Sequence, residues 1–245
     1  MKLRIFALYF LFTPAALPLN NSYIGKGWNV VLNDSCGQPS HSKDHPSIMW
    51  NDEVEKQELV FTLNPGEIGK CPTDSNHRHG APYWERAEVR QYGNLTGNQN
   101  YRIKFDVKFI QGFSSERETF FQIHTSNKKC FSAPILMMKF NYGLLTIDLL
   151  SGISATSKNG NHKNKYLGNI YVRDLKKYNS FEVVFNQKRK IITIYKDGIT
   201  LIKNQNYEKK ECGTPYLKLG IYRPGNEQAE TSKSSYKNIT VEKIY

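Results

Sequence analysis

The chain has 245 residues, of which 39% are hydrophobic and 13% aromatic, so one domain with a sizeable core is feasible. Its 34 Lys and Arg residues against 22 Asp and Glu give a formal net charge of +12. A basic surface attracts polyanions, so the charge is compatible with nucleic acid, acidic membrane or acidic glycan, although excess lysine can also serve solubility alone. Beyond the first residues, no stretch is long and apolar enough for a transmembrane helix, which excludes a helical membrane protein.

Residues 1–19 have the pattern of a signal peptide. Lys2 and Arg4 form a positive start, and residues 5–12 (IFALYFLF) form an apolar run too short to span a bilayer. Small residues follow, as expected near a cleavage site. We therefore expect a mature domain over residues 20–245 that is secreted to the extracellular space or the periplasm.

Short segments with period-two alternation dominate the rest of the chain, and helical periodicity is almost absent. The expected strands are Trp28–Leu32, Glu58–Leu63, Arg86–Tyr92, Tyr101–Phe109, Glu118–His124, Ile135–Phe140, Leu144–Leu150, Ser180–Asn186, Ile191–Tyr195, Tyr216–Tyr222 and Asn238–Ile244. Turn signals separate them at residues 64–66, 141–143, 197–198 and 223–225. The pair Asp197-Gly198 between IITIYK and ITLI predicts a tight hairpin. The whole pattern predicts an all-β fold, a two-sheet antiparallel β-sandwich of the jelly-roll, concanavalin-like type.

Four cysteines, Cys36, Cys71, Cys130 and Cys212, predict two disulfides in an exported chain, with three connectivities open. Buried free thiols are the alternative. No CxxC pair is present, which argues against a zinc site. Two long polar stretches, residues 70–82 and 151–165, are expected to be loops that either border a site or simply tolerate insertions.

Three of the expected strands carry polar groups that a purely structural strand would not need. Their polar members share one face: Arg86, Glu88 and Arg90; Gln122 and His124; and Tyr216, Lys218, Gly220 and Tyr222. Their apolar members point to the core: Ala87 and Val89; Phe121 and Ile123; and Leu217, Leu219 and Ile221. A solvated outer face is the ordinary explanation for any one of these strands. Taken together, their polar groups form the set that a uronate eliminase needs.

Removal of the weakly acidic C5 proton of a uronate requires neutralisation of the adjacent carboxylate, because charge builds there in the transition state. Arg86 or Arg90, together with Gln122, can supply this neutralisation. A base must take the proton and an acid must protonate the departing oxygen, and His124 and Tyr222 are the natural pair.

Tyr222 needs a nearby cation to act as a base, since free tyrosine has a pKa of about 10. Lys218, which shares its face, could provide that cation. Gly220 is expected to leave room for a sugar ring close to the backbone.

The segments RAEVR (86–90), QIH (122–124) and YLKLGIY (216–222) resemble the three signature strands of the jelly-roll polysaccharide lyases. In alginate lyases these read R-[ST]-E-L-R, Q-[IV]-H and Y-F-K-A-G-x-Y, and heparin lyase I and glucuronan lyases are related. The resemblance covers roughly residues 80–245, in the same order along the chain. Two positions depart from the alginate lyase pattern: Arg223-Pro224 replaces Asn-Gln, and Leu219 replaces Ala. The segment LKLGIYR is more similar to the glucuronan and heparin lyases, so the identity of the uronic acid in the substrate stays open.

The resemblance implies a role for each matching residue. Arg86 and Gln122 would neutralise the carboxylate, and His124 and Tyr222 would be base and acid, unless Tyr222 does both for one stereochemistry. Lys218 would support Tyr222 and touch the substrate. Further substrate contacts are expected in the concave groove from Arg90, Glu88 and Trp84, the last as a stacking platform. The chemistry would require no cofactor, and nothing in the sequence supports a structural calcium.

Several other residues have simpler explanations. Glu116 and Glu118 are a same-face carboxylate pair, but the E-x-D-x-x-E strand of sandwich-fold glucanases is absent, so we interpret them as surface charges. His77 and His79 could line the cleft or serve as a second base, but solvated loop residues are the favoured interpretation. The two remaining tryptophans, Trp28 and Trp50, suit either the core or sugar stacking.

The sequence thus predicts a secreted polysaccharide lyase that cleaves a glucuronan-, alginate- or heparin-like polysaccharide by β-elimination, giving 4,5-unsaturated products. The expected partner is that anionic polysaccharide, with no nucleic acid and no membrane, and the expected state is a monomer. A non-catalytic lectin for acidic glycans on the same fold is the alternative, but it would not need both a base and an acid. A sandwich-fold glycoside hydrolase is the third hypothesis, and the missing glutamate motif argues against it.

Overall fold

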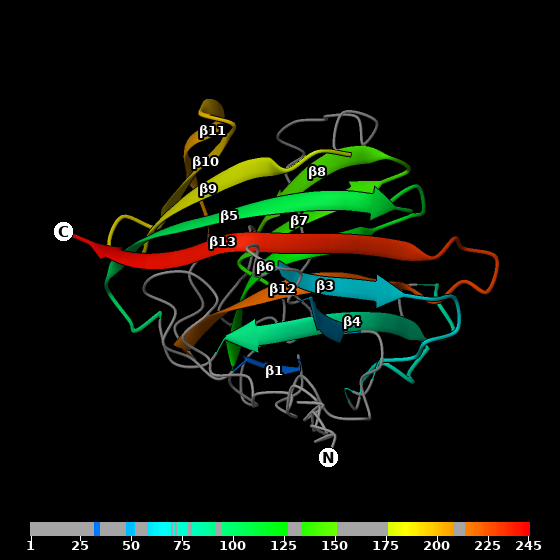
Figure 1. The fold of residues 1–245 in the computed structure, drawn as a ribbon. Helices are drawn as coiled ribbons and strands as arrows, with labels where there is room; N and C mark the ends of the chain where they lie inside the picture. Colours follow the sequence, from blue (N-terminus) through cyan, green and yellow to red (C-terminus); the bar gives the residue numbers. More distant parts are fainter. Residues whose placement is uncertain are drawn as a thin grey trace, which may run out of the picture.

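A computed structural model describes residues 32–34, 48–51, 58–69, 71, 73–77, 80–91, 95–126, 134–150, 176–207 and 214–245. Every named element in these residues is a strand (Figure 1). The strands are β1 (Leu32–Asp34), β2 (Ile48–Asn51), β3 (Glu58–Leu63), β4 (Trp84–Gln91), β5 (Asn100–Gln111), β6 (Glu118–Ser126), β7 (Leu136–Asn141), β8 (Leu144–Leu149), β9 (Asn179–Asn186), β10 (Ile191–Lys196), β11 (Ile199–Asn206), β12 (Thr214–Pro224) and β13 (Ser232–Ile244). The expected signal peptide and the 151–165 loop lie outside the described residues.

The strands form two antiparallel sheets. One has the order β1-β4-β12-β6-β7-β8 and the other the order β11-β10-β9-β5-β13-β3-β2. They pack face to face, since Phe105 of β5 stacks on Phe121 of β6 with ring centroids 4.9 Å apart. The predicted two-sheet β-sandwich is confirmed, while β2 is a strand that the sequence analysis did not predict.

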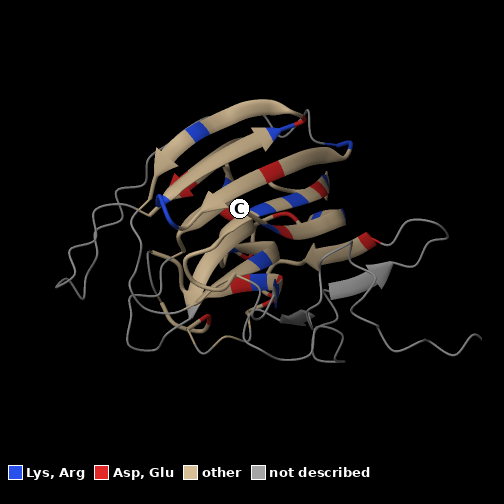
Figure 2. Ribbon diagram, turned by 90° about the vertical axis from the view of Figure 1, so that its left-hand side faces the viewer, with Lys and Arg blue, Asp and Glu red and all other residues tan. Residues whose placement is uncertain are grey.

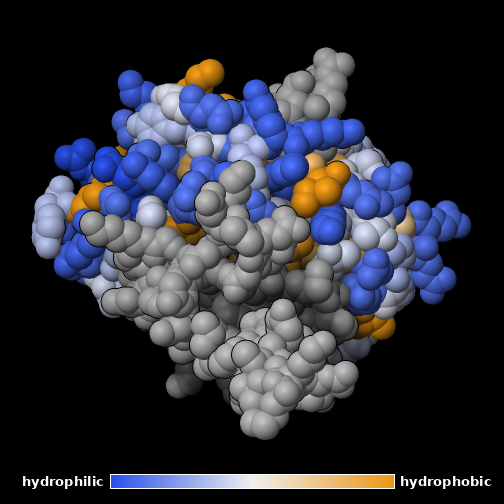
Figure 3. All heavy atoms as spheres, viewed as in Figure 1, coloured by the Kyte–Doolittle hydropathy of each residue, from blue (hydrophilic) through white to orange (hydrophobic). Residues whose placement is uncertain are grey.

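The core lies between the two sheets and is rich in aromatic side chains. Phe109 of β5 makes edge-to-face contacts with Phe113, Phe120 and Phe140, at centroid distances of 4.7 to 5.0 Å. Such edge-to-face pairs add stability beyond the area that they bury. The outer face of the seven-stranded sheet, by contrast, is mostly hydrophilic where it is visible (Figure 3). Within the described part of the chain, no helix is long and apolar enough to cross a membrane.

Two hairpins confirm the turn predictions. Asp197 and Gly198 have φ values of 50° and 78°, and Tyr142 and Gly143 have φ values of 50° and 77°. Two consecutive positive φ angles are the mark of a type I′ turn, whose twist matches that of the flanking strands. The turns therefore join β10 to β11 and β7 to β8 as antiparallel hairpins.

Gly220 in β12 is required by the backbone of a neighbouring strand. Its φ is +132°, and a Cβ atom there would lie 2.2 Å from the carbonyl oxygen of Ala87 in β4. The pairing of β12 with β6 also shifts register between Leu219 and Tyr222. We expected Gly220 to make room for a sugar ring, but its Cβ direction is filled by β4, so the glycine permits close packing of two strands.

Candidate active site

The three motif strands are neighbours in the six-stranded sheet, in the order β4-β12-β6. The paired positions are Tyr222 with Arg86, Gly220 with Glu88, Lys218 with both Arg90 and Gln122, and Tyr216 with His124. The residues that alternate with them are in the hydrophobic core, so these polar groups lie on the opposite face of the sheet. On the strands of the sandwich, positions of basic residues lie close to positions of acidic residues (Figure 2). The concave groove itself stays a prediction.

Arg86 is buried and held by two carboxylates. Its Nε and Nη2 each donate to Asp74 at 2.8 Å, and its Nη1 donates to Glu88 at 2.5 Å. Burial by itself would lower the pKa of Arg86, but Glu88 and Asp74 raise it above its usual range. Arg86 is therefore a permanent cation with a fixed orientation.

Asp74 is a site residue that the sequence analysis missed. It is fully buried, and its backbone oxygen accepts a hydrogen bond from the Trp84 amide at 2.7 Å. A Cβ atom on Gly69 would lie 2.1 Å from its Oδ2, so that glycine makes room for the carboxylate. The sequence contained one indication of this role, since Asp74 is an acidic residue in the polar stretch before RAEVR. A buried arginine requires a carboxylate partner, and this stretch could supply one.

Glu88 is the hub of the site. It accepts hydrogen bonds from Arg86 and, at 2.6 Å, from the Gln122 side-chain amide, and its Oε2 lies 3.8 Å from Lys218 Nζ. Only 1% of its surface is exposed. We expected Glu88 to contact substrate, but in the structure its carboxylate holds two cations and one amide in place.

Tyr222 lies between an arginine and a tryptophan. The Arg86 guanidinium carbon is 3.9 Å from the centroid of its ring, and Trp84 stacks on the ring at 4.9 Å with an angle of 24°. Trp84 was expected to be a sugar platform, but it is only 6% exposed and packs against Tyr222. The cation on Tyr222 is Arg86, whereas Lys218 stands four residues away, about 13 Å along an extended strand.

His124 lies at the other end of the motif face. Its Nδ1 is 2.9 Å from the carbonyl oxygen of Thr125, and its ring stacks on Tyr216 at 5.3 Å. A carbonyl oxygen only accepts, so Nδ1 carries the proton in this contact and Nε2 of the neutral ring can accept one. His124 pairs with Tyr216, six residues from Tyr222 or roughly 20 Å of extended strand. The sheet register therefore separates the backbones of the expected base and acid.

Lys218 adds a buried positive charge between the two ends. Burial, and next the charge of Arg86, lower the pKa of Lys218 to about 8, although Glu88 opposes the shift. Among the described residues, the cluster holds the three cations Arg86, Arg90 and Lys218 against the two carboxylates Asp74 and Glu88, which leaves one positive charge in excess. This excess suits a carboxylate ligand.

A pH-dependent affinity is expected from Lys218. The side chain is charged below its pKa and becomes neutral as the pH rises through about 8, so affinity for a uronate oligosaccharide should fall about tenfold or more toward pH 10. Calorimetric titration of the Tyr222→Phe variant, which is expected not to turn over its ligand, measures this. In a Lys218→Met, Tyr222→Phe double variant the decline should disappear. An identical pH dependence in both proteins would show that Lys218 does not contact the carboxylate.

Asp74→Asn is expected to lower kcat by about 100-fold with little change in KM, because Arg86 would lose its two-point support and shift against Tyr222. Steady-state kinetics of this variant test the effect. The control is Asp106→Asn on the other sheet, where the carboxylate bonds only to Ser180 and Asn238 among the contacts described. If Asp74→Asn changed KM alone, Asp74 would not position a catalytic group.

The carboxylate pair in and before β6 shows one correct interpretation and one error. Glu116 is exposed and forms a 2.7 Å ion pair with Arg117. Glu118 was also interpreted as a surface charge, but it is fully buried and pairs with Arg223 at 3.0 Å. The spacing of Glu118 from Glu116 could not reveal this ion pair, because the partner, Arg223, is far away in the sequence.

The remaining sequence predictions have mixed outcomes. His77 is exposed, as expected, whereas His79 and Trp28 lie outside the described residues, as does the side chain of Trp50. Cys71 has no free thiol, but its three candidate partners lie outside the described residues, so the disulfide pairing stays a prediction. Among the described side chains, no group of three or more His, Cys, Asp or Glu residues is placed to hold a metal ion. The cofactor requirement also stays a prediction.

Comparison with known proteins rests on structure alone. No family matches the chain by sequence, and neither does any curated protein. Among solved structures, the family 7 alginate lyase AlgAT5 aligns with a TM-score of 0.55 at 15% identity, over 86% of this chain and 88% of its own. The family 7 alginate lyase A1-II′ in complex with a GGG product gives 0.59 at 17% identity, over 81% and 84%. An alginate lyase from Pseudomonas aeruginosa gives 0.55 at 13% identity, over 84% and 88%.

The chain has the fold of the family 7 polysaccharide lyases. The resemblance inferred from three short motifs is thereby confirmed at the level of the fold. Those motifs lie on adjacent strands, β4, β12 and β6, in the middle of one sheet. At this level of identity the fold does not determine the substrate, and function depends on the side chains of the site.

Proposed function

We propose that this protein is a polysaccharide lyase that cleaves a uronate-containing anionic polysaccharide by β-elimination. The observation that carries the proposal is the placement of Tyr222 directly against Arg86, beside the buried Glu88, Gln122 and Lys218 cluster. A tyrosine held by a permanent cation can exchange a proton, and the excess positive charge next to it can neutralise a carboxylate.

In the proposed reaction, Arg86, which lies against Tyr222, binds the uronate carboxylate together with Gln122, and Lys218, which shares the Glu88 carboxylate, adds positive charge. Asp74 and Glu88 engage three of the five N–H groups of Arg86, and the other two have no partner among the described residues, so they can serve a ligand. The Tyr222 phenolate, stabilised by Arg86, takes the C5 proton, and the C5–H electron pair forms the C4–C5 double bond. The C4–O bond breaks, its electron pair goes to the departing oxygen, and Tyr222 returns the proton that it took from C5 to that oxygen, which regenerates the phenolate.

Tyr222 is proposed to serve as both base and acid, because the strand register puts His124 next to Tyr216 instead. This was the second of the two roles considered from sequence. His124 then acts at a neighbouring sugar unit, or as the base for the opposite stereochemistry at C5. The variants discussed below distinguish these roles.

Two structures of a solved neighbour carry substitutions of the same residue types. Alginate lyase A1-II′ is known in complex with the product GGG as a Tyr-to-Phe variant, and in complex with the substrate GGMG as a His-to-Asn, Tyr-to-Phe variant. Alginate is therefore the first substrate to test, although Arg223-Pro224 departs from the alginate lyase pattern and keeps glucuronan and heparin as candidates. Because such polymers are extracellular, we propose that the protein acts outside the cell after loss of residues 1–19.

The test is incubation of the purified protein with alginate, glucuronan, heparin, heparan sulfate and hyaluronan while the ultraviolet absorbance of the unsaturated product is recorded. A lyase gives rising absorbance on at least one polymer, together with chain shortening. New saturated reducing ends without absorbance would indicate a hydrolase. Binding without any chain shortening would indicate a lectin, and either result would overturn the proposed function.

A further inference from the structure

A polar pocket of about 270 Å³ lies beyond Tyr222, at the end of the motif face. It is lined by residues of three separate segments, 80–81, 115–117 and 224–226. Two of these segments adjoin the motif strands directly, since Pro224 ends β12 and Arg117 precedes β6. The mechanism proposed above makes no use of this pocket.

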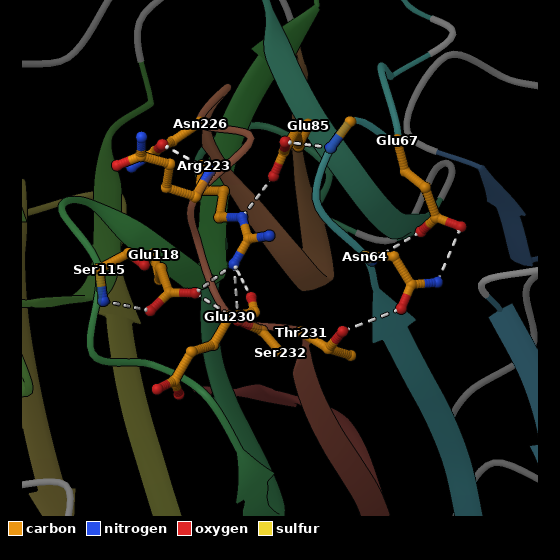
Figure 4. A network of polar contacts seen from close by, with 12 residues as sticks. Asn64, Glu67, Glu85, Ser115, Glu118, Arg223, Asn226, Glu230, Thr231 and Ser232 are labelled. Carbon is orange, nitrogen blue, oxygen red and sulfur yellow. Dashed lines mark hydrogen bonds and ion pairs between the residues drawn. The ribbon is translucent and has the colours of Figure 1, made fainter.

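A buried ion cluster fixes the walls of the pocket (Figure 4). Arg223, only 1% exposed, binds Glu85 at 2.5 Å and Glu118 at 3.0 Å. The second oxygen of Glu118 accepts a hydrogen bond from the Ser115 amide at 3.0 Å. The same carboxylate therefore ties the wall that contains Ser115 to the strand end that carries the turn at Gly225.

The turn on the other side of the pocket is also held in place. The Gly225 amide donates to the Tyr83 carbonyl oxygen at 2.8 Å, and a Cβ atom on Gly225 would lie 2.2 Å from the Tyr83 ring. Glycine lets the turn pack directly on that ring. The pocket is thus a preformed feature of the fold, which lowers the entropic cost of binding a ligand.

Arg117 connects the pocket to the active site. Its guanidinium carbon lies 5.9 Å from the centre of the Trp84 ring. Trp84 stacks on Tyr222, and the Arg86 guanidinium lies over the Tyr222 ring. Arg117 is 32% exposed and its ion-pair partner Glu116 is 46% exposed. The Arg117 guanidinium therefore carries its charge in the pocket wall, where solvent and a dissolved anion can reach it.

We propose that this pocket is a subsite for a further acidic sugar unit of the same polymer, whose carboxylate is bound by Arg117. This inference rests on the proposed function and adds one specificity-determining residue to it. The volume is just below the range of sites for drug-sized ligands, so it suits one sugar ring, and the cation selects a charged ring over a neutral one. The two aromatic rings between Arg117 and Arg86 separate the two anion-binding positions along the chain of sugars.

The test compares Arg117→Gln with the wild type on size-defined oligosaccharides of whichever polymer is cleaved, from trisaccharides to octasaccharides. For long substrates kcat/KM should fall about tenfold, which corresponds to about 1.4 kcal/mol, with kcat unchanged. For the shortest substrates, which cannot reach both positions, the variant should equal the wild type. Arg189→Gln, an exposed arginine in the turn between β9 and β10, is the matched control and should change neither value.

Equal kinetics of Arg117→Gln and wild type at every length would overturn the subsite, as would a loss that is the same for the shortest and longest substrates. Failure of the proposed function gives a different result, since the wild type would then produce no absorbance on any polymer. In that case affinity electrophoresis in gels containing each polymer still tests the subsite. Arg117→Gln should be retarded less than Arg189→Gln, and equal retardation would refute the inference.

Discussion

Replacement of Tyr222 by phenylalanine is expected to reduce turnover by at least about 1000-fold, because a group that transfers the proton is typically worth 10²- to 10⁴-fold and Tyr222 is proposed to act twice. The ring should stay in place, since Trp84 stacks on it and the Arg86 guanidinium lies over it. The rate of absorbance increase at saturating substrate measures the loss. Oligosaccharide affinity should remain within a few fold of the wild type.

A His124→Ala variant, measured in parallel, distinguishes a mechanism in which Tyr222 is both base and acid from one in which His124 is the base. If Tyr222 alone serves as base and acid, His124→Ala should mainly raise KM, since the ring stands next to Tyr216. A loss of kcat as large as that of Tyr222→Phe would instead make His124 the base. Thermal unfolding of both variants should match the wild type, and full activity of Tyr222→Phe would refute the assigned chemistry.

Arg223→Met is expected to cost about 3–5 kcal/mol in the free energy of unfolding, because it leaves Glu85 and Glu118 as buried carboxylates without their cation. Methionine keeps much of the side-chain volume, so the effect reports the lost charge and not a cavity. Urea denaturation followed by circular dichroism measures the change. The cost is large because the stability of a whole domain is only about 5–15 kcal/mol.

The matched control is Arg102→Met, since Arg102 is 41% exposed and pairs with Glu182 at 2.9 Å. An exposed pair is worth about 0–1 kcal/mol, so this variant should unfold nearly as the wild type does. Adding Glu118→Gln to Arg223→Met should recover part of the loss, because one uncompensated carboxylate is removed. If Arg223→Met were no more destabilising than Arg102→Met, the buried cluster would not support this end of the sandwich.

The walls of the proposed subsite are held by the ion pairs of Arg223 with Glu85 and Glu118. Variants of Arg117 and of Arg223 therefore test different properties, ligand binding and stability. Arg117 lies in the pocket wall and can be replaced without touching the Arg223 ion pairs. A change in substrate-length dependence for Arg117→Gln at unchanged stability therefore reports binding. A change in stability for Arg223→Met reports the framework below it (Figure 4).

Alternation of residue types was enough to predict most of the strands and, for the three motif strands, the side that faces the core. Ala87, Phe121 and Leu219 are all buried in the core as expected, and the Asp197-Gly198 turn closes its hairpin. These features are local, because the period of two comes from the pleat of a single strand and the turn type from two φ angles. The three motifs could therefore be assigned to strands, and their polar faces identified, from the order of the residues alone.

What the sequence by itself determined is thus the all-β class, the inward and outward faces, and the residue types that meet on the polar face of β4, β12 and β6. Only the tertiary structure decided which charges pair. Asp74 binds Arg86, Trp84 covers Tyr222, and Glu118 pairs with Arg223 across 105 positions of sequence. Charge pairing depends on which strands become neighbours and on how far each side chain is removed from water, and neither is a property of a local segment.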